Sequence, residues 1–197
     1  MASDASTTAQ ILRTAEFLVR SRGYNAFSYA DIAKVVGIST ASIHYHFPSK
    51  ADLVRGITAR YIDGVDGRLA AIRRDVSGVH ERLAAFVALF RESLGEDEMD
   101  RMCACMMLAT EAGSLPSDVR AMVSDFIHAT GAWVADVMTE GRDAGEIDFA
   151  GDAALEGGTL CATIEGATFV ARGCNDISMF DRIAARALSA LRPHAAR

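Results

Sequence analysis

The stretch from Ser28 to Leu53 decides the fold, and it reads SYADIAKVVGISTASIHYHFPSKADL. Ser28 is followed three residues later by Asp31, and Ser49 is followed three residues later by Asp52. This is the spacing of a capping box, in which a hydroxyl residue and an acid close the first turn of a helix together. The stretch therefore predicts helix starts at both serines.

A glycine turn divides the same stretch. Gly37 is expected to end the first short helix, Ser39 to cap the next one, and Pro48 to stop it. An earlier helix is expected from about Thr7, which has its own capping-box spacing, to Arg22. Three short helices, the last two separated by a glycine turn, are typical of a helix-turn-helix.

The remainder of the chain predicts a helical body. Only three prolines occur in 197 residues, β-branched alternation is scarce, and apolar residues recur at helical spacing. We expect an all-α fold of about nine helices, with a helix-turn-helix DNA-binding domain over residues 1–48 and a helical ligand-sensing and dimerisation domain over 49–197. The body helices are expected from residue 49 onward and over 83–94, 100–112, 116–141, 152–172 and 176–191.

Charge is unevenly distributed along the chain. The formal net charge is −6, yet residues 1–50 hold five Lys or Arg against three acids. A mildly basic head on an acidic body suits a protein that binds DNA at one end. No stretch has the length of a membrane span and no signal peptide precedes the head, so we expect a cytoplasmic protein without a membrane partner.

Motifs for catalysis and metal binding are missing from the sequence. It contains no Glu-x-x-His pair, H-E-x-x-H, G-x-S-x-G, phosphate-binding loop or dinucleotide fingerprint, so we expect no enzyme and no cofactor. The four cysteines lack zinc spacing and indicate reduced core thiols and no metal. Cys103 and Cys105 leave open a thiol-based electrophile or redox sensor, although residues two apart point away from one another on a helix.

The segments 23–33, 36–39 and 43–53 resemble the DNA-binding head of the TetR family of bacterial transcriptional regulators. The resemblance covers about residues 7–55; beyond them the chain agrees in length, helix count and helix order. It implies a homodimer in which each subunit presents its third helix to a major groove of a pseudo-palindromic operator. It also implies repression that a small-molecule effector relieves by moving the long fourth helix.

The third helix supplies most of the expected DNA contacts. A recognition helix exposes short polar groups to base edges near its N-terminus, a small residue suits a thymine methyl, and a lysine beside free N–H groups suits a phosphate. The alternative is that some of these residues are only caps or partly buried scaffold. The residues expected to bind DNA are Ser28, Tyr29, Thr40, Ala41, Ser42, His44, Tyr45, His46 and Lys50.

Large adaptable side chains in the middle helices predict an effector site for a small, mainly apolar ligand, with one acidic residue to orient it. The alternatives are plain core packing and a dimerisation body that binds no ligand. The expected ligand residues are Phe86, Phe90, Met102, Met106, Phe126, Trp133 and Glu165. The last two helices are expected to form the dimer, because Gly158, Ala162 and Gly166 recur every four residues as one smooth face.

Overall fold

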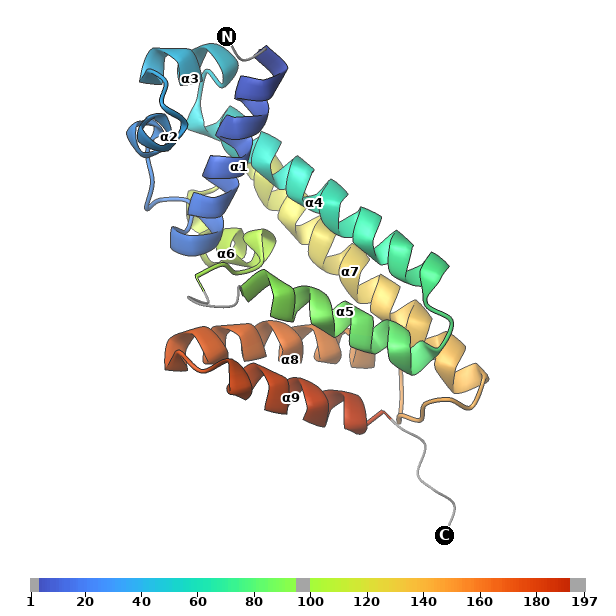
Figure 1. Cartoon of the computed structure of the whole chain (residues 1–197). Helices are drawn as coiled ribbons and strands as arrows, with labels where there is room; N and C mark the ends of the chain where they lie inside the picture. Colours follow the sequence, from blue (N-terminus) through green and yellow to red (C-terminus); the bar gives the residue numbers. More distant parts are fainter. Residues whose placement is uncertain (1–3, 95–99, 192–197) are drawn as a thin grey trace. The chain divides into compact units, whose positions relative to one another are not determined.

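The computed structural model describes residues 4–94 and 100–191, which form nine α-helices and one short 3-10 helix without any strand (Figure 1). The prediction of an all-α chain of about nine helices is confirmed. The helices are α1 Asp4–Arg22, α2 Tyr29–Val36, α3 Thr40–His46, α4 Lys50–Asp75, α5 Val79–Leu94, α6 Ala104–Thr110, η1 Ala112–Ser114, α7 Ser117–Asp143, α8 Ala153–Cys174 and α9 Ile177–Ser189.

The chain divides into two compact units. The head unit holds the residues up to Gly64 together with Cys103–Phe126, and the body unit holds Val65–Met102 and the residues from Ile127 onward. The long helices α4 and α7 each contribute to both units. The compact head unit therefore includes α6 and the start of α7 as well as the helices expected to bind DNA. The expected boundary after residue 48, between a DNA-binding domain and a ligand-sensing domain, stays a prediction.

Helix starts in the head follow the capping pattern. The amide and the hydroxyl of Ser28 both donate to Asp31 Oδ2, at 2.8 and 2.6 Å, and Gly37 ends α2 in the left-handed conformation at φ 76°. Ser49 and Asp52 exchange hydrogen bonds in the same way. The expected start of the first helix at Thr7 is wrong by three residues, since nothing in residues 4–6 interrupts a helix and α1 begins at Asp4.

The sixth helix is shorter than expected. Residues 100–103 are irregular, and Cys103 precedes α6 with an extended ψ of 125°. Met102 and Cys103 are nonetheless buried, so this segment contributes to the core without being helical. The expected helix over 100–112 is thereby reduced to Ala104–Thr110, followed by the 3-10 turn η1.

Each unit has its own apolar core. The head core consists of fully buried aliphatic residues at helical spacing, namely Ile11, Ile32, Ile43, Leu53 and Ile57. The body core centres on α5, α7, α8 and α9, with Leu83, Phe86, Val134, Val137, Met138, Ile164 and Phe180 all at most 1% exposed. No helix in the described ranges has the length and apolar character needed to cross a membrane.

Candidate DNA-binding and effector sites

The recognition helix α3 is anchored from within and open on its outer side. Ile43 is fully buried and Phe47, which follows the helix, is 9% exposed, so these two residues fix the helix to the head core. Thr40, Ala41 and Tyr45 lie on the opposite side and are exposed, Tyr45 by 77%. The helix thus presents a hydroxyl, a methyl and a phenol on a rigid support.

Three other α3 residues expected to bind DNA already have partners inside the head. Ser42 shares hydrogen bonds with the capping Ser39, and His46 Nδ1 lies 3.0 Å from Thr8 Oγ1. His44 Nδ1 lies 3.2 Å from the carbonyl of Pro48. Because a carbonyl only accepts, Nδ1 is the donor in this hydrogen bond, which leaves Nε2 as the ring nitrogen for a DNA contact.

Tyr29 fastens α2 to the end of α3. Its hydroxyl donates to the carbonyl of Phe47 at 2.8 Å, and its ring packs against His44 at a centroid distance of 4.6 Å. Burial, followed by the negative charge of Asp52, raises the pKa of Tyr29 to about 12, so the hydroxyl keeps its proton at physiological pH. Tyr29 is therefore a scaffold residue as well as a predicted DNA contact.

The ammonium of Lys50 is turned toward the connection between α1 and α2. Its Nζ donates to the carbonyl of Phe27 at 2.5 Å and lies over the rings of Tyr24 and Phe27, 4.7 and 4.3 Å from their centroids. Burial lowers the pKa of Lys50, while the carboxylates of Glu111 and Asp31 oppose that shift. Its predicted phosphate contact must come from the ammonium hydrogens that Phe27 leaves unused.

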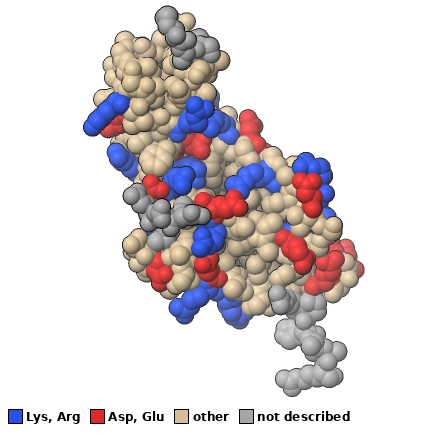
Figure 2. Space-filling model, in the orientation of Figure 1, with Lys and Arg blue, Asp and Glu red and all other residues tan. Residues whose placement is uncertain are grey.

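The outer end of the head carries few charges on the face that Figure 2 shows. Ser28 is exposed directly before α2, and its hydroxyl already donates to Asp31. DNA affinity should therefore depend on neutral hydrogen bonds and helix N-termini more than on Lys or Arg.

The body unit brings three of the predicted effector residues together. Phe86 stacks on Trp133 at a centroid distance of 5.7 Å and meets Phe90 edge-on at 5.1 Å. The guanidinium of Arg73 lies 5.7 Å from the centre of the Trp133 ring. The indole Nε1–H of Trp133 is buried without an acceptor among the described residues, which leaves a directed donor for a bound molecule.

The other predicted effector residues are distributed over both units. Met102 is fully buried, and Glu165, on α8, is a buried carboxylate at 8% exposure. Burial, followed by the charge of Glu165, raises the pKa of the Cys161 thiol to about 12. Met106 and Phe126 belong to the head unit, where the ring of Phe126 meets that of Tyr61 at 6.1 Å.

The remaining cysteines differ in their access to solvent. Cys103 and Cys105 are 3% and 0% exposed, whereas Cys174 is exposed at the end of α8. Within the described ranges no three His, Cys, Asp or Glu side chains come together as a metal site.

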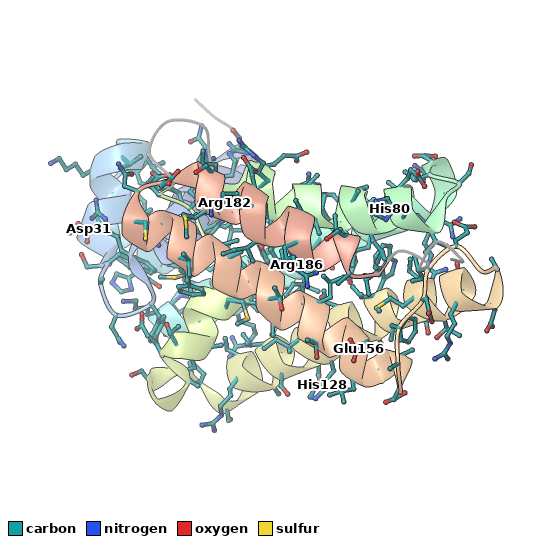
Figure 3. The ribbon with its side chains drawn as sticks, turned by 90° about the horizontal axis from the view of Figure 1, so that it is seen from below. Asp31, His80, His128, Glu156, Arg182 and Arg186 are labelled. Carbon is teal, nitrogen blue, oxygen red and sulfur yellow. The ribbon has the colours of Figure 1, made fainter. Side chains whose placement is uncertain are left out.

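A groove between α8 and α9 was not anticipated from the sequence. It has a volume of about 580 Å³, and Arg182 and Arg186 of α9 and Glu156 of α8 line it (Figure 3). None of these three charges has an ion-pair partner in the described part of the chain. The i, i+4 spacing of the two arginines on an amphipathic helix was the only available signal.

The small-residue face lies beside this groove. A Cβ added at Gly158 or Gly166 would meet nothing within 4 Å, whereas one at Gly157 would lie 2.9 Å from the backbone nitrogen of Ala135. Gly157 is thus the glycine that lets α7 and α8 approach inside the body unit, and Gly158 and Gly166 face open space. The same outer side of α8 exposes the apolar side chains of Leu155, Phe169 and Val170.

These features define a helix-turn-helix DNA-binding protein with a helical regulatory body. A family model described as "Bacterial regulatory proteins, tetR family" matches residues 11–57, and one described as "Tetracyclin repressor-like, C-terminal domain" matches residues 79–187. The chain belongs to the TetR family of transcriptional regulators.

Solved structures agree over nearly the whole chain. A TetR-family transcriptional regulator from Agrobacterium tumefaciens is 32% identical with a TM-score of 0.93, over 97% of this chain and 100% of that one. A regulator from Saccharomonospora viridis, solved in complex with choline, is 26% identical with a TM-score of 0.82, over 97% and 100%.

Curated relatives are more distant. The transcriptional regulator TtgR of Pseudomonas putida is 29% identical over 62% of this chain and 49% of its own length. AcuR of Cereibacter sphaeroides is 26% identical over 74% of this chain and 68% of its own length. The chain thus spans about half the length of TtgR, and the same holds for its relative ArpR.

Proposed function

We propose that the protein is a transcriptional repressor that binds a pseudo-palindromic operator as a homodimer and leaves it when a small organic effector binds the body. The observation that carries the DNA-binding part is the outer side of α3, where Thr40, Ala41 and Tyr45 are exposed above a buried Ile43. These are side chains that reach base edges or phosphates from a major groove.

Operator binding tests this part directly. Thr40→Ala should lower the preference for specific over random DNA, costing about 1–3 kcal/mol if the hydroxyl contacts a base. Fluorescence anisotropy with the intergenic DNA beside the protein's own gene measures this preference, and Lys34→Ala, on the exposed side of α2, serves as a control that removes a charge without touching α3. Equal preference in wild type and a Thr40→Ala/Tyr45→Ala double variant would refute the proposal.

The dimer is proposed to form through α8 and α9. The groove between them has charges of both signs that lack an ion-pair partner among the described residues, and the outer side of α8 is small or apolar at Leu155, Gly158 and Val170. A two-fold axis brings the same patch of a second copy against the first, so the cations of each copy meet the anion of the other. One partner of identical sequence thus covers the apolar residues and pairs the charges.

Sedimentation of a single variant tests the dimer. Gly166→Leu should raise the monomer fraction, because the leucine projects into space that the second copy would fill. Gly67→Leu, on α4, is the matched control, since a side chain there also meets nothing within 4 Å. Unchanged dimer in Gly166→Leu would place the interface elsewhere.

The effector is proposed to bind beside Trp133 in the body unit. The cluster of Phe86, Phe90 and Trp133 supplies aromatic surface, and the indole N–H supplies a directed donor. A mainly apolar molecule with one acceptor fits these groups. Because aromatic faces also bind quaternary ammonium groups, and the Saccharomonospora viridis regulator was solved with choline, choline is one probe worth including.

Trp133 is the only tryptophan, so its fluorescence reports the site. A true effector should change this fluorescence and release operator DNA over the same concentration range. Trp133→Phe should weaken the response while sparing DNA binding. A panel in which ligands bind and alter the fluorescence yet never release DNA would contradict the sensing role. A panel in which no ligand binds would favour a body that only dimerises.

A further inference from the structure

The connection between α1 and α2, residues 23–28, is held by a residue that is far away in the sequence. Glu111 follows α6, and its Oε2 accepts a hydrogen bond of 2.8 Å from the backbone amide of Asn25. The contact lies wholly within the head unit. It joins the short segment between α6 and α7 to the start of the helix-turn-helix.

The same carboxylate fits closely against the turn. Gly23 is buried at φ 91°, and a Cβ added there would lie 2.0 Å from Glu111 Oε1. The left-handed backbone favours glycine at this position, and a side chain there would displace the carboxylate from its place against the turn. Burial and then the charge of Glu111 raise the pKa of the neighbouring Tyr24 hydroxyl.

Lys50 also contacts this connection, because its ammonium donates to the carbonyl of Phe27. Beyond Phe27 the chain enters α2, and Tyr29 joins α2 to the end of α3 through the carbonyl of Phe47. These hydrogen bonds therefore lead from Glu111 through the α1–α2 connection to the end of the recognition helix. None of the links needs Glu111 to touch DNA.

We propose that Glu111 is a positioning residue for DNA binding, which holds the α1–α2 connection so that α2 and α3 present their outer sides together. The inference rests on the proposed function of α3 and extends it to a residue outside the helix-turn-helix. It also gives the segment from α6 to η1 a role in DNA binding, because α6 packs on α1 in the same head unit.

The charge of Glu111 and its proposed positioning role predict opposite changes in DNA affinity when the residue is replaced. Removal of a negative charge should strengthen binding to polyanionic DNA at any site of the head. A loss of affinity in Glu111→Ala at unchanged Tm would run against that sign and would indicate lost positioning. Glu111→Gln removes the charge but keeps a side-chain oxygen that accepts from the Asn25 amide, so it should retain the wild-type affinity or exceed it.

The experiment measures operator affinity over a range of salt concentrations for wild type, Glu111→Ala, Glu111→Gln and the control Asp125→Ala, which removes an exposed carboxylate of the same unit. Glu111→Ala should bind about three- to thirtyfold more weakly, with an unchanged slope against salt because no phosphate contact is lost. Amide exchange should show faster exchange at Asn25 in this variant and wild-type protection in Glu111→Gln.

Two outcomes would overturn the proposal. One is wild-type affinity in Glu111→Ala while the Asn25 amide exchanges fast; the other is equal loss in Glu111→Ala and Glu111→Gln. If Thr40→Ala and Tyr45→Ala also leave operator binding unchanged, the proposed role of α3 fails instead, and the two failures are thereby distinguished.

Discussion

Two tyrosines in the head differ in their surroundings, since Tyr29 bonds within the head and Tyr45 is exposed. Removing each hydroxyl in turn distinguishes a residue that stabilises the fold from one that contacts DNA. Tyr29→Phe deletes the 2.8 Å bond to the carbonyl of Phe47. A hydrogen bond of this kind contributes about 0.5–1.5 kcal/mol to stability, which for a chain of this length lowers Tm by roughly 1–6 °C. Tyr29→Phe should therefore melt earlier than wild type.

Tyr45→Phe should behave in the opposite way. The Tyr45 side chain is 77% exposed, and its ring meets that of His46 edge-on at a centroid distance of 5.2 Å. Loss of its hydroxyl should leave Tm unchanged. If the hydroxyl contacts a base or phosphate, operator affinity should fall by about 1–3 kcal/mol, or roughly five- to 150-fold.

Thermal melts by circular dichroism and anisotropy titrations on the same preparations measure both quantities. The protein concentration must be held fixed, since dimerisation makes Tm depend on it. The reasoning is refuted if Tyr45→Phe melts early and binds normally, because Tyr45 would then be scaffold and the outer side of α3 would not read DNA.

Three further predictions concern packing, pH and thiol access. Gly157→Ala should destabilise the body, because its Cβ would lie 2.9 Å from the Ala135 backbone nitrogen. Gly67→Ala, which meets nothing within 4 Å, should raise the free energy of unfolding by up to about 1 kcal/mol through helix propensity. Urea denaturation measures both effects, and equal midpoints for the two variants would contradict this prediction. The hydrogen bond from the Ser28 hydroxyl, and then the one from its amide, lower the pKa of Asp31 in the folded protein. The ionised carboxylate therefore stabilises the fold above its ordinary pKa of 3.8, and this stabilisation is lost as the pH falls through the lowered pKa of the folded protein. Wild type should accordingly exceed Asp31→Asn in Tm at neutral pH and converge with it in strong acid, and a constant difference across the range would count against the capping role. A brief maleimide treatment should add one label, at the exposed Cys174. Cys103 and Cys105 should stay unlabelled because they are buried, and Cys161 because its thiol pKa is raised to about 12. Mass spectrometry reads the labelled positions, and fast labelling at Cys103 or Cys105 would instead support a thiol sensor.

Local signals in the head correctly predicted where α2 and α4 begin and where α2 ends. The Ser28–Asp31 and Ser49–Asp52 pairs and the glycine at residue 37 act over three or four residues, and the structure contains each cap where the spacing places it. The capping spacing at Thr7 misled, because nothing before that residue stops the helix from continuing to Asp4.

Contacts between distant residues could not be predicted in the same way. Lys50 has the position of a phosphate contact in the sequence, yet its ammonium donates to Phe27, 23 residues away. Glu111 belongs to no sequence motif, and its partner is the amide of Asn25, 86 residues away. No periodicity or motif records such pairs, since they depend on how helices pack.

The body shows the same limit for single residues. The stripe of small residues on α8 was visible, but only the packing distinguishes Gly157, which contacts Ala135, from Gly158, which faces open space. The aromatic stripe likewise predicted Phe86, Phe90 and Trp133 without indicating that Phe126 meets Tyr61 in the head unit.

The most direct test of the central claim, that α3 reads DNA within a two-fold dimer, is selection of bound sequences from a random duplex pool. Wild type should enrich an inverted repeat whose half-sites lie one helical turn, or a multiple of it, apart. A Thr40→Ala/Tyr45→Ala variant of unchanged Tm should lose that enrichment. Enriched sequences without two-fold symmetry, or the same repeat selected by both proteins, would contradict the claim.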